Sequence, residues 1–203
     1  MFYELENVDP ILRFGDVIEG FQMLKPNYNN FPTDKLNFQI SVENFKYFIV
    51  TTPCCSIEKS KLSVAALKEI RPAFLKNEYF AEDLTRINRL VSPENSVPKI
   101  AWEKFPEEEK QKRIGCGFSY TFLDIFVYDS NDLLENYELN SKEGKINCGY
   151  YMIDFKDIFV IESDQIQRNK KIPKILQLSI KSRDELRTKL ATYFNRVPEE
   201  DVI

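Results

Sequence analysis

The spacing of apolar residues changes twice along the chain, and this change constrains the fold more than any other feature of the sequence. Before residue 71 and again after residue 116, apolar residues gather in short β-prone runs bounded by proline, glycine or asparagine. Between residues 71 and 114 they recur at helical spacing or give way to dense charge. The pattern predicts one α+β domain, residues 1–203, in which a β scaffold carries a helical insertion at 71–114.

Two pairs of runs indicate how the strands are joined. Residues 36–42 and 45–52 are separated only by Glu43-Asn44, which predicts a tight turn between paired strands, and Pro53 then ends the second strand. The two most aromatic runs, residues 117–130 and 149–163, are expected to pair with each other. The predicted strands are 11–24 (strand or hairpin), 36–42, 45–52, 62–70 (a strand crossing the core), 117–130, 149–163 and 174–180.

Helical patterns occur in the insertion and at the end of the sequence. Residues 77–91 place apolar side chains near helical spacing, and the charged stretch 101–114 is either a solvated face or a docking arm. Near the end, Ser182 and Glu185 have the spacing of a capping box. The apolar residues after it form one stripe, so an amphipathic C-terminal helix is expected to lie on the core. Its stripe comprises Leu186, Leu190, Tyr193 or Phe194, and Val197.

The chain contains no histidine. Ser-His-Asp and Cys-His catalysis, histidine general bases and zinc sites with histidine ligands are therefore excluded within this chain. Any chemistry must use carboxylates, amines, hydroxyls or thiols. From the sequence we predict no catalytic residue, no bound metal and no cofactor.

Composition predicts a cytoplasmic protein with free thiols. There is no run of 18 or more apolar residues, and the first residues, MFYELENVDP, are acidic and lack the pattern of a signal peptide. Four cysteines in 203 residues fall short of the density of a disulfide scaffold. No membrane partner is expected.

The cysteines leave three interpretations open. Cys54 and Cys55 follow a predicted buried strand, where a thiol can be a nucleophile, a metal ligand or simply a small apolar residue at a strand end. Cys116 and Cys148 each precede a glycine and would complete a four-thiolate zinc site. Since no CxxC spacing is present, the structural interpretation is preferred over zinc and over catalysis.

A second hypothesis concerns acidic residues on the two aromatic runs. Asp124 or Asp129 on one run, with Asp154-Phe155-Lys156 on the other, resemble the pattern by which restriction-type nucleases hold Mg²⁺ at a phosphate. Alternation along a strand would place Asp154 and Lys156 on one face. The same pattern is common on solvated strand faces, so it remains an alternative.

Charge is distributed unevenly, although the net charge is only −4. Residues 165–197 hold nine basic and two acidic residues, a local charge of +7. We expect the basic stretch to contact a protein partner with an acidic surface, whereas nucleic acid is a weaker fit because the rest of the chain is acidic. The predicted contact residues are Arg168, Lys170, Lys171 and Lys174.

The sequence RFGDVIEGF, with Gly15-Asp16-Val17, and the later run 45–67 resemble the entry of the PemK/MazF-like fold of plasmid-maintenance toxins. This likeness covers roughly the first 70 residues. It implies an SH3-like, partly open β-barrel with the helical insertion and the C-terminal amphipathic helix added to it. It also implies an endoribonuclease as the alternative function, but the arginine and hydroxyl pair of such toxins has no matching residues here.

A likeness over nearly the whole length is to uncharacterised bacterial proteins often encoded in defence islands. Its landmarks are Gly15-Asp16-Val17, Thr52-Pro53-Cys54-Cys55-Ser56, Ile153-Asp154-Phe155-Lys156 and Phe194-Asn195-Arg196-Val197. Ser56 stands where those proteins carry an acidic residue. The resemblance implies a non-catalytic interaction or regulatory subunit of a bacterial antiviral-defence or toxin-antitoxin-like system.

Overall fold

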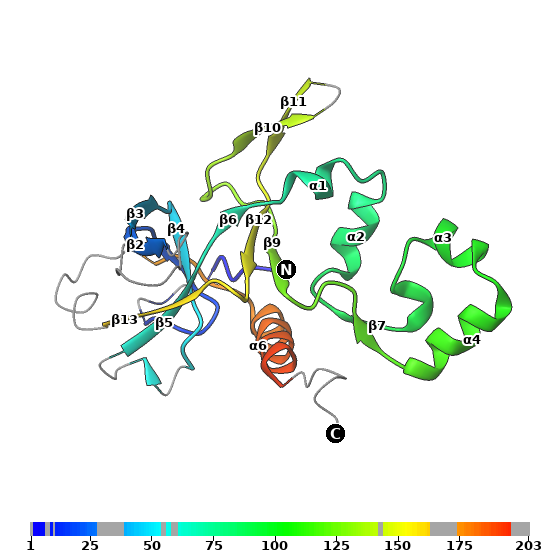
Figure 1. The fold of residues 1–203 in the computed structure, drawn as a ribbon. Coiled ribbons are helices and arrows are strands. Elements are labelled where there is room, and N and C mark those ends of the chain that lie inside the picture. Colours follow the sequence, from blue (N-terminus) through cyan, green and yellow to red (C-terminus); the bar gives the residue numbers. More distant parts are fainter. Residues whose placement is uncertain are drawn as a thin grey trace, which may run out of the picture.

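The computed structural model describes residues 2–6, 9, 11–27, 39–53, 56–57, 61–141, 144–162 and 174–195. Short antiparallel strands form the body of the protein, with the helices of residues 72–116 on one side and the C-terminal helix near the middle (Figure 1). The α+β class predicted from the sequence is confirmed. Every sheet within the described ranges is open, and none of them closes into a barrel.

Five antiparallel strands form the largest sheet, in the order β13-β5-β4-β1-β14. The central strand β4 is buried along its whole length, because all four of its residues are apolar or aromatic and suit a strand covered on both faces. Its Ile49 lies opposite Val17 on one side and Ala65 on the other. The strands are β1 (Val17–Glu19), β4 (Tyr47–Val50), β5 (Lys61–Ala66), β13 (Ile158–Glu162) and β14 (Lys174–Leu176).

A second sheet of three antiparallel strands, in the order β6-β12-β9, is joined to the first by two continuous runs of chain. β5 leads through Leu67 into β6, so the predicted strand 62–70 does cross from one sheet to the other. The predicted pairing of the two aromatic runs is also confirmed, since Val127 in β9 lies opposite Met152 in β12. The strands are β6 (Lys68–Glu69), β9 (Ile125–Tyr128) and β12 (Tyr151–Asp154).

Three two-stranded ribbons account for the other described strands. The predicted turn at Glu43-Asn44 is wrong as a hairpin, because β3 pairs with β2, whereas β4 pairs with β1 and β5. Burial explains the separation: β4 is apolar and enters the core, while residues 41–44 of β3 are polar or exposed. The ribbons are β2 (Gln22–Asn27) with β3 (Gln39–Asn44), β7 (Leu90–Val91) with β8 (Ser119–Tyr120), and β10 (Tyr137–Ser141) with β11 (Gly144–Cys148).

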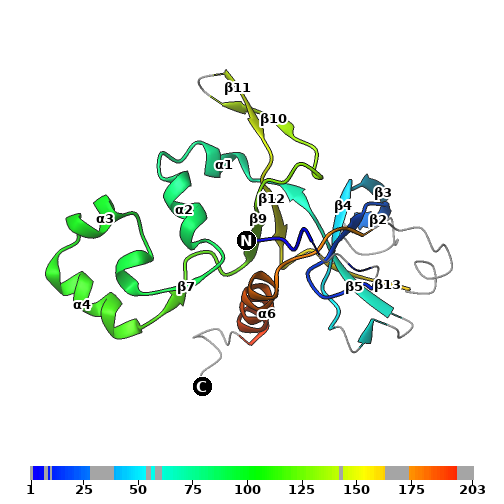
Figure 2. The same ribbon diagram turned by 180° about the vertical axis from the view of Figure 1, so that it is seen from behind.

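The helices of the 71–114 segment differ in how they are buried. Phe74 in α1 and Ile87 at the end of α2 join Ile125 and Met152 in a core cluster beneath the second sheet. By contrast, α3 and α4 contain no buried residue. In Figures 1 and 2 they lie on the opposite side of the molecule from the five-stranded sheet. The elements are α1 (Pro72–Leu75), α2 (Phe80–Arg86), the 3₁₀ helix η2 (Pro93–Asn95), α3 (Lys99–Lys104) and α4 (Glu107–Cys116).

The C-terminal helix α6 (Ile180–Phe194) packs on the main core as predicted. Leu186 is fully buried there, which contributes about 2 kcal/mol to stability. The predicted capping box is wrong, because Ser179 is the N-cap: its Oγ accepts a hydrogen bond from the Ser182 backbone N at 3.3 Å. Ser182 itself is a buried residue within the first turn. Among the described helices, none combines the length and the apolarity needed to cross a bilayer.

Candidate functional site

The structure places one of the four predicted partner-binding residues in the interior. The Lys174 side chain is 5% exposed, and its Nζ lies 2.8 Å from Asp16 Oδ2 and 3.6 Å from Asp9 Oδ1. The same ammonium donates a hydrogen bond to the Ile11 carbonyl oxygen at 2.9 Å. Arg168, Lys170 and Lys171 lie outside the described residues, so their predicted role stays a prediction. Lys174 serves the fold of this chain.

Two of the four basic side chains of α6 are also buried in the protein. Arg183 is buried and donates a hydrogen bond to the Leu178 carbonyl oxygen at 2.9 Å, and Lys189 is fully buried with its ammonium bonded to the Ile87 carbonyl oxygen. Of the basic residues in the described part of α6, only Lys181 and Arg187 are exposed, and Arg187 pairs with Asp184 at 2.9 Å. The local charge counted along the sequence therefore overstates the charge that this helix presents at the surface.

The two described cysteines have separate environments. Cys148 is buried at the end of β11, where its thiol lies 3.3 Å from the Tyr137 hydroxyl, while Cys116 is exposed at the end of α4. In the described ranges no group of three or more Cys, Asp or Glu residues could hold a metal ion. Cys54 and Cys55 fall outside those ranges, so the hypothesis of a four-thiolate site stays untested.

The structure brings together one of the two acidic pairs that the sequence suggested. Asp124 precedes β9 and Asp154 ends β12, and Arg71 contacts both: its Nη2 lies 2.5 Å from Asp154 Oδ2 and 3.8 Å from Asp124 Oδ2. Lys156 Nζ adds a contact of 3.3 Å to Asp124. Asp129, at the other end of β9, does not take part in this cluster.

This acidic cluster is balanced by its own cations. Lys156 belongs to the turn after β12 and not to the strand, so the expected shared strand face of Asp154 and Lys156 is wrong. The turn nevertheless joins the two, because the Lys156 backbone N donates to Asp154 Oδ1 at 3.0 Å. Two carboxylates thus face two cations, and a metal ion would have to displace Arg71 from Asp154.

A groove of about 810 Å³ runs between α2, β7 and the helical arm, by which we mean η2, α3 and α4. Its apolar lining is unusually open to solvent: Leu90 is 52% exposed and Phe118 is 67% exposed. Trp102, from α3, lines the same groove, and its ring packs edge-on against Phe105 with the centroids 6.1 Å apart. The apolar residues of the groove are Leu90, Val91, Val97, Trp102 and Phe118.

The charged residues of the groove are unequally engaged. Glu82 accepts a hydrogen bond from the Lys99 backbone N at 3.3 Å, and a hydrogen bond from the Ser92 hydroxyl lowers the pKa of Glu94. The cations are freer. Arg89 Nε lies 3.7 Å from Glu185 Oε1, beyond hydrogen-bond distance, and the Lys99 ammonium makes no ion pair within the described residues. The groove therefore offers the cations Lys99 and Arg89 without a close ion pair, beside the carboxylates of Glu82 and Glu94 and the apolar lining.

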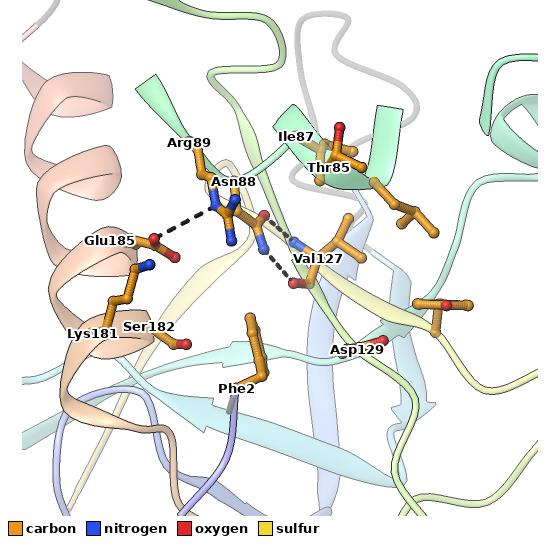
Figure 3. A pocket seen from close by; sticks show the side chains of 12 residues that line it. Phe2, Thr85, Ile87, Asn88, Arg89, Val127, Asp129, Lys181, Ser182 and Glu185 are labelled. Carbon is orange, nitrogen blue, oxygen red and sulfur yellow. Dashed lines mark hydrogen bonds and ion pairs between the residues drawn. The ribbon is translucent and has the colours of Figure 1, made fainter. Parts of the chain in front are cut away.

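A smaller cavity of about 370 Å³ lies between the first turn of α6, the end of α2 and strand β9 (Figure 3). Phe2 points into it from below, while Arg89, Lys181 and Glu185 approach from one side and Asp129 lies on the other. Thr85 and Arg89 line both this cavity and the groove. The cavity and the groove are therefore neighbours that share these two residues.

One wall of the cavity is fixed by a side chain that completes the second sheet. The Asn88 amide donates to the Val127 carbonyl oxygen at 2.6 Å and accepts from the Val127 backbone N at 2.8 Å. These two bonds replace a neighbouring strand along the free edge of β9. Both the donor and the acceptor of the Asn88 amide are therefore used by Val127, so a ligand would bind through the charged residues of the cavity.

Sequence reasoning missed both hollows. It identified the charged stretch 101–114 as a possible docking arm, and the groove lies against that stretch. The available signal was the pair Trp102 and Phe105, two aromatic residues three positions apart in a charged stretch of the sequence. The cavity had no such signal, because Phe2, Asp129 and Lys181 come from distant parts of the chain.

Comparisons with known proteins give no match: no protein-family model, no curated protein and no solved structure is similar to this chain.

Proposed function

We propose that the protein is a non-catalytic protein-interaction subunit that holds a partner in the groove beside its helical arm. The observation that carries this proposal is the state of the arm: α3 and α4 bury none of their residues, yet Trp102 faces a groove whose Leu90 and Phe118 are more than half exposed. Exposed apolar surface of this kind, rimmed by polar residues, marks interaction sites.

The energetics favour a protein segment as the occupant. Apolar surface removed from water contributes about 25 cal/mol per Å², and tryptophan is among the residues that most often dominate binding energy at an interface. A groove of about 810 Å³ exceeds one side chain and accommodates several from a single segment. Covering Leu90, Trp102 and Phe118 together supplies the central apolar contact that a stable interface needs.

Charge complementarity defines the chemistry of that segment. Glu82 and Glu94 are engaged within the groove, whereas Lys99 and Arg89 present exposed cations at its rim. The partner segment is therefore apolar with acidic residues beside its apolar side chains. This agrees with the acidic partner surface expected from Arg168, Lys170 and Lys171, which offer a second contact for the same partner.

The biological setting belongs to the same proposal and rests on sequence likeness alone. The landmarks shared with defence-island proteins support an accessory role in a bacterial antiviral-defence or toxin-antitoxin-like system. The PemK/MazF-like resemblance of the first 70 residues supports an SH3-like ancestry for the β scaffold. Nucleic acid is the less favoured partner, since two of the four cations of α6, Arg183 and Lys189, are buried.

Selection from a displayed library of random peptides tests the proposal directly. The chain contains a single tryptophan, Trp102, whose fluorescence reports occupancy of the groove. We expect selected peptides to combine aromatic or aliphatic residues with Asp or Glu and to shift this fluorescence. Phe118→Ser and Lys99→Glu should each weaken binding about tenfold, since each removes roughly 1.4 kcal/mol or more of contact energy.

Two matched substitutions distant from the groove serve as controls. Leu133→Ser removes an apolar side chain that is 58% exposed, and Lys145→Glu reverses an exposed charge that pairs with Glu138. Both should leave peptide affinity unchanged. Selected peptides that lack acidic residues, or that bind the Phe118 and Lys99 variants as well as the original protein, would remove the basis of the proposal.

A second candidate function is a Mg²⁺-dependent nuclease, favoured by one observation: Asp124 and Asp154 lie at the same end of β9 and β12 and share Arg71. Mixed RNA and DNA incubated with the protein, with and without Mg²⁺, tests this alternative. Cleavage that requires Mg²⁺ and is lost in Asp154→Ala would establish it. Intact substrates under both conditions would exclude it and leave the interaction subunit.

A further inference from the structure

The cavity shown in Figure 3 has the size and the chemistry of a small-molecule site, and it adjoins the groove that carries the proposed function. Its volume of about 370 Å³ lies within the range of ligand pockets in proteins. Three features of its lining limit what it can bind: a pair of cations, an aromatic floor and an isolated carboxylate.

The cations gather at one side of the cavity. Lys181 makes no ion pair among the described residues, and Arg89 Nε stands 3.7 Å from Glu185 Oε1. Both side chains are exposed, so both can close on an anion. Lys181 also lies in the first turn of the 15-residue helix α6, which has no acidic residue in that turn to oppose the positive end of the helix dipole.

Glu185 is the anion that a ligand must outcompete. Its carboxylate Oε1 lies 3.7 Å from Arg89 Nε, which makes an ion pair without a hydrogen bond. A phosphate carries about −1.5 to −2 charges at pH 7 and three acceptor oxygens, against one charge for the carboxylate. Charge-assisted bonds from Arg89 and Lys181 to a phosphate therefore prevail over the contact with Glu185.

The floor of the cavity favours a flat ring. Phe2 is anchored from behind by Tyr3 and Tyr128, with ring centroids 4.8 Å and 6.1 Å away, and it points into the cavity in Figure 3. Tyr150 adds a second aromatic wall. On the far side from the cations, the Asp129 carboxylate is oriented by a 3.0 Å bond from the Ser130 backbone N and offers an acceptor to a ring N–H group.

We propose that this cavity binds a small phosphorylated molecule with a planar, nitrogen-bearing ring, of the nucleoside monophosphate class. The phosphate lies between Arg89 and Lys181 at the first turn of α6, the ring lies on Phe2, and a ring amino group donates to Asp129. The site is distinct from the groove, because its ring contact involves neither Trp102 nor Phe118, but the two share Arg89.

Binding is tested by titrating the full chain with AMP, GMP, CMP and UMP, followed by calorimetry and by amide chemical shifts at Asn88, Val127 and Ser182. Two substitutions should change affinity in opposite directions. Lys181→Glu should weaken binding about tenfold or more by losing a charge-assisted contact. Glu185→Gln should strengthen it about threefold to tenfold by removing the competing anion. Lys112→Glu, an exposed charge reversal on α4, should leave affinity unchanged.

Two further ligands test the phosphate contact and the ring contact separately. Inorganic phosphate and adenosine, added singly, should each bind more weakly than AMP, because each occupies half of the cavity. Phosphate that binds as tightly as AMP overturns the ring contact, and adenosine that binds as tightly as AMP overturns the phosphate contact. The absence of shifts at Asn88, Val127 and Ser182 with all four nucleotides overturns the site itself, whatever the groove binds.

Discussion

Asp16 and Lys174 form an ion pair in the interior of the protein, with Oδ2 and Nζ 2.8 Å apart and with side chains that are 0% and 5% exposed. The pair fastens the edge strand β14 to the residues that lead into β1. Burial raises the pKa of the Asp16 carboxyl, and the hydrogen bond and charge of Lys174 oppose that rise. The Gly-Asp-Val motif and the basic stretch, which suggested a family landmark and a partner surface, thus meet in one structural contact.

Replacing either member of this pair should destabilise the protein strongly. Lys174→Met leaves the Asp16 carboxylate buried without its cation, and a broken buried pair typically costs about 3–5 kcal/mol. Urea denaturation followed by circular dichroism measures the loss in the free energy of unfolding. The double variant Asp16→Asn with Lys174→Met should regain part of it, and strictly additive losses would show that the two residues act independently.

Gly15 and Gly115 offer a matched pair of glycine substitutions with opposite expected effects. Gly15 has φ +86°, and a Cβ there would lie 2.9 Å from Leu178 Cδ1, so Gly15→Ala should cost about 2 kcal/mol. Gly115 is helical with no atom within 4 Å of an added Cβ, so Gly115→Ala should stabilise by about 0.5–1 kcal/mol. Thermal unfolding of both variants checks the signs, and equal effects would contradict the backbone argument.

Asn88→Ala should loosen the free edge of β9. The substitution removes both hydrogen bonds to Val127 and leaves that backbone N–H and carbonyl without a partner, at a cost of about 1–3 kcal/mol. Amide hydrogen exchange at Val127 should accelerate accordingly, by about tenfold or more. The amide of Val64 in β5 serves as the control, and equal acceleration there would indicate global destabilisation in place of local loss.

Lys189 should make stability depend on pH in the neutral to alkaline range. Burial lowers the pKa of this ammonium to about 7, with Asp124 opposing the effect, whereas the unfolded chain keeps the ordinary value of 10.5. Between these values the unfolded state binds the additional proton, so the free energy of unfolding should rise with pH by roughly 1 kcal/mol per unit. Urea titrations at pH 7, 8 and 9 measure the slope.

The variant Lys189→Met isolates this contribution, since it keeps the length of the buried side chain and removes the titrating group. Its stability should vary less with pH than that of the original protein over the same interval. The Arg187→Met variant on the exposed face of α6 should keep the original slope. Identical slopes in all three proteins would mean that Lys189 does not lose its proton in the folded state.

Much of the strand order followed from local pattern. The run that contains Val127 and the run that contains Met152 were predicted to pair and do pair, because strongly apolar, β-prone segments have few alternatives to a buried sheet. The Glu43-Asn44 turn was wrong for the converse reason. A short gap between two strands indicates a hairpin only when both strands pack on the same surface. Here β4 enters the core, whereas β3 stays exposed.

The candidate sites were harder to predict, because they depend on which charges fold inward. Nine basic residues close together in sequence suggested a surface patch, but the side chains of Lys174 and Lys189 are buried against acceptors far away in the chain, and Arg183 is buried against the nearby Leu178 carbonyl oxygen. No periodicity in the sequence indicates which acceptors these buried cations meet. The convergence of Asp124 with Asp154 was foreseeable from strand pairing, whereas the helix cap lies three residues before the predicted one, at Ser179.

Arg89 lines both the cavity and the groove, and it has one guanidinium to offer. A phosphate that draws this group toward α6 removes positive charge from the rim where an acidic segment would dock. By thermodynamic reciprocity, the docked segment must weaken the phosphate by the same factor. The two proposed ligands, a small phosphorylated molecule and an acidic protein segment, would therefore compete for one arginine.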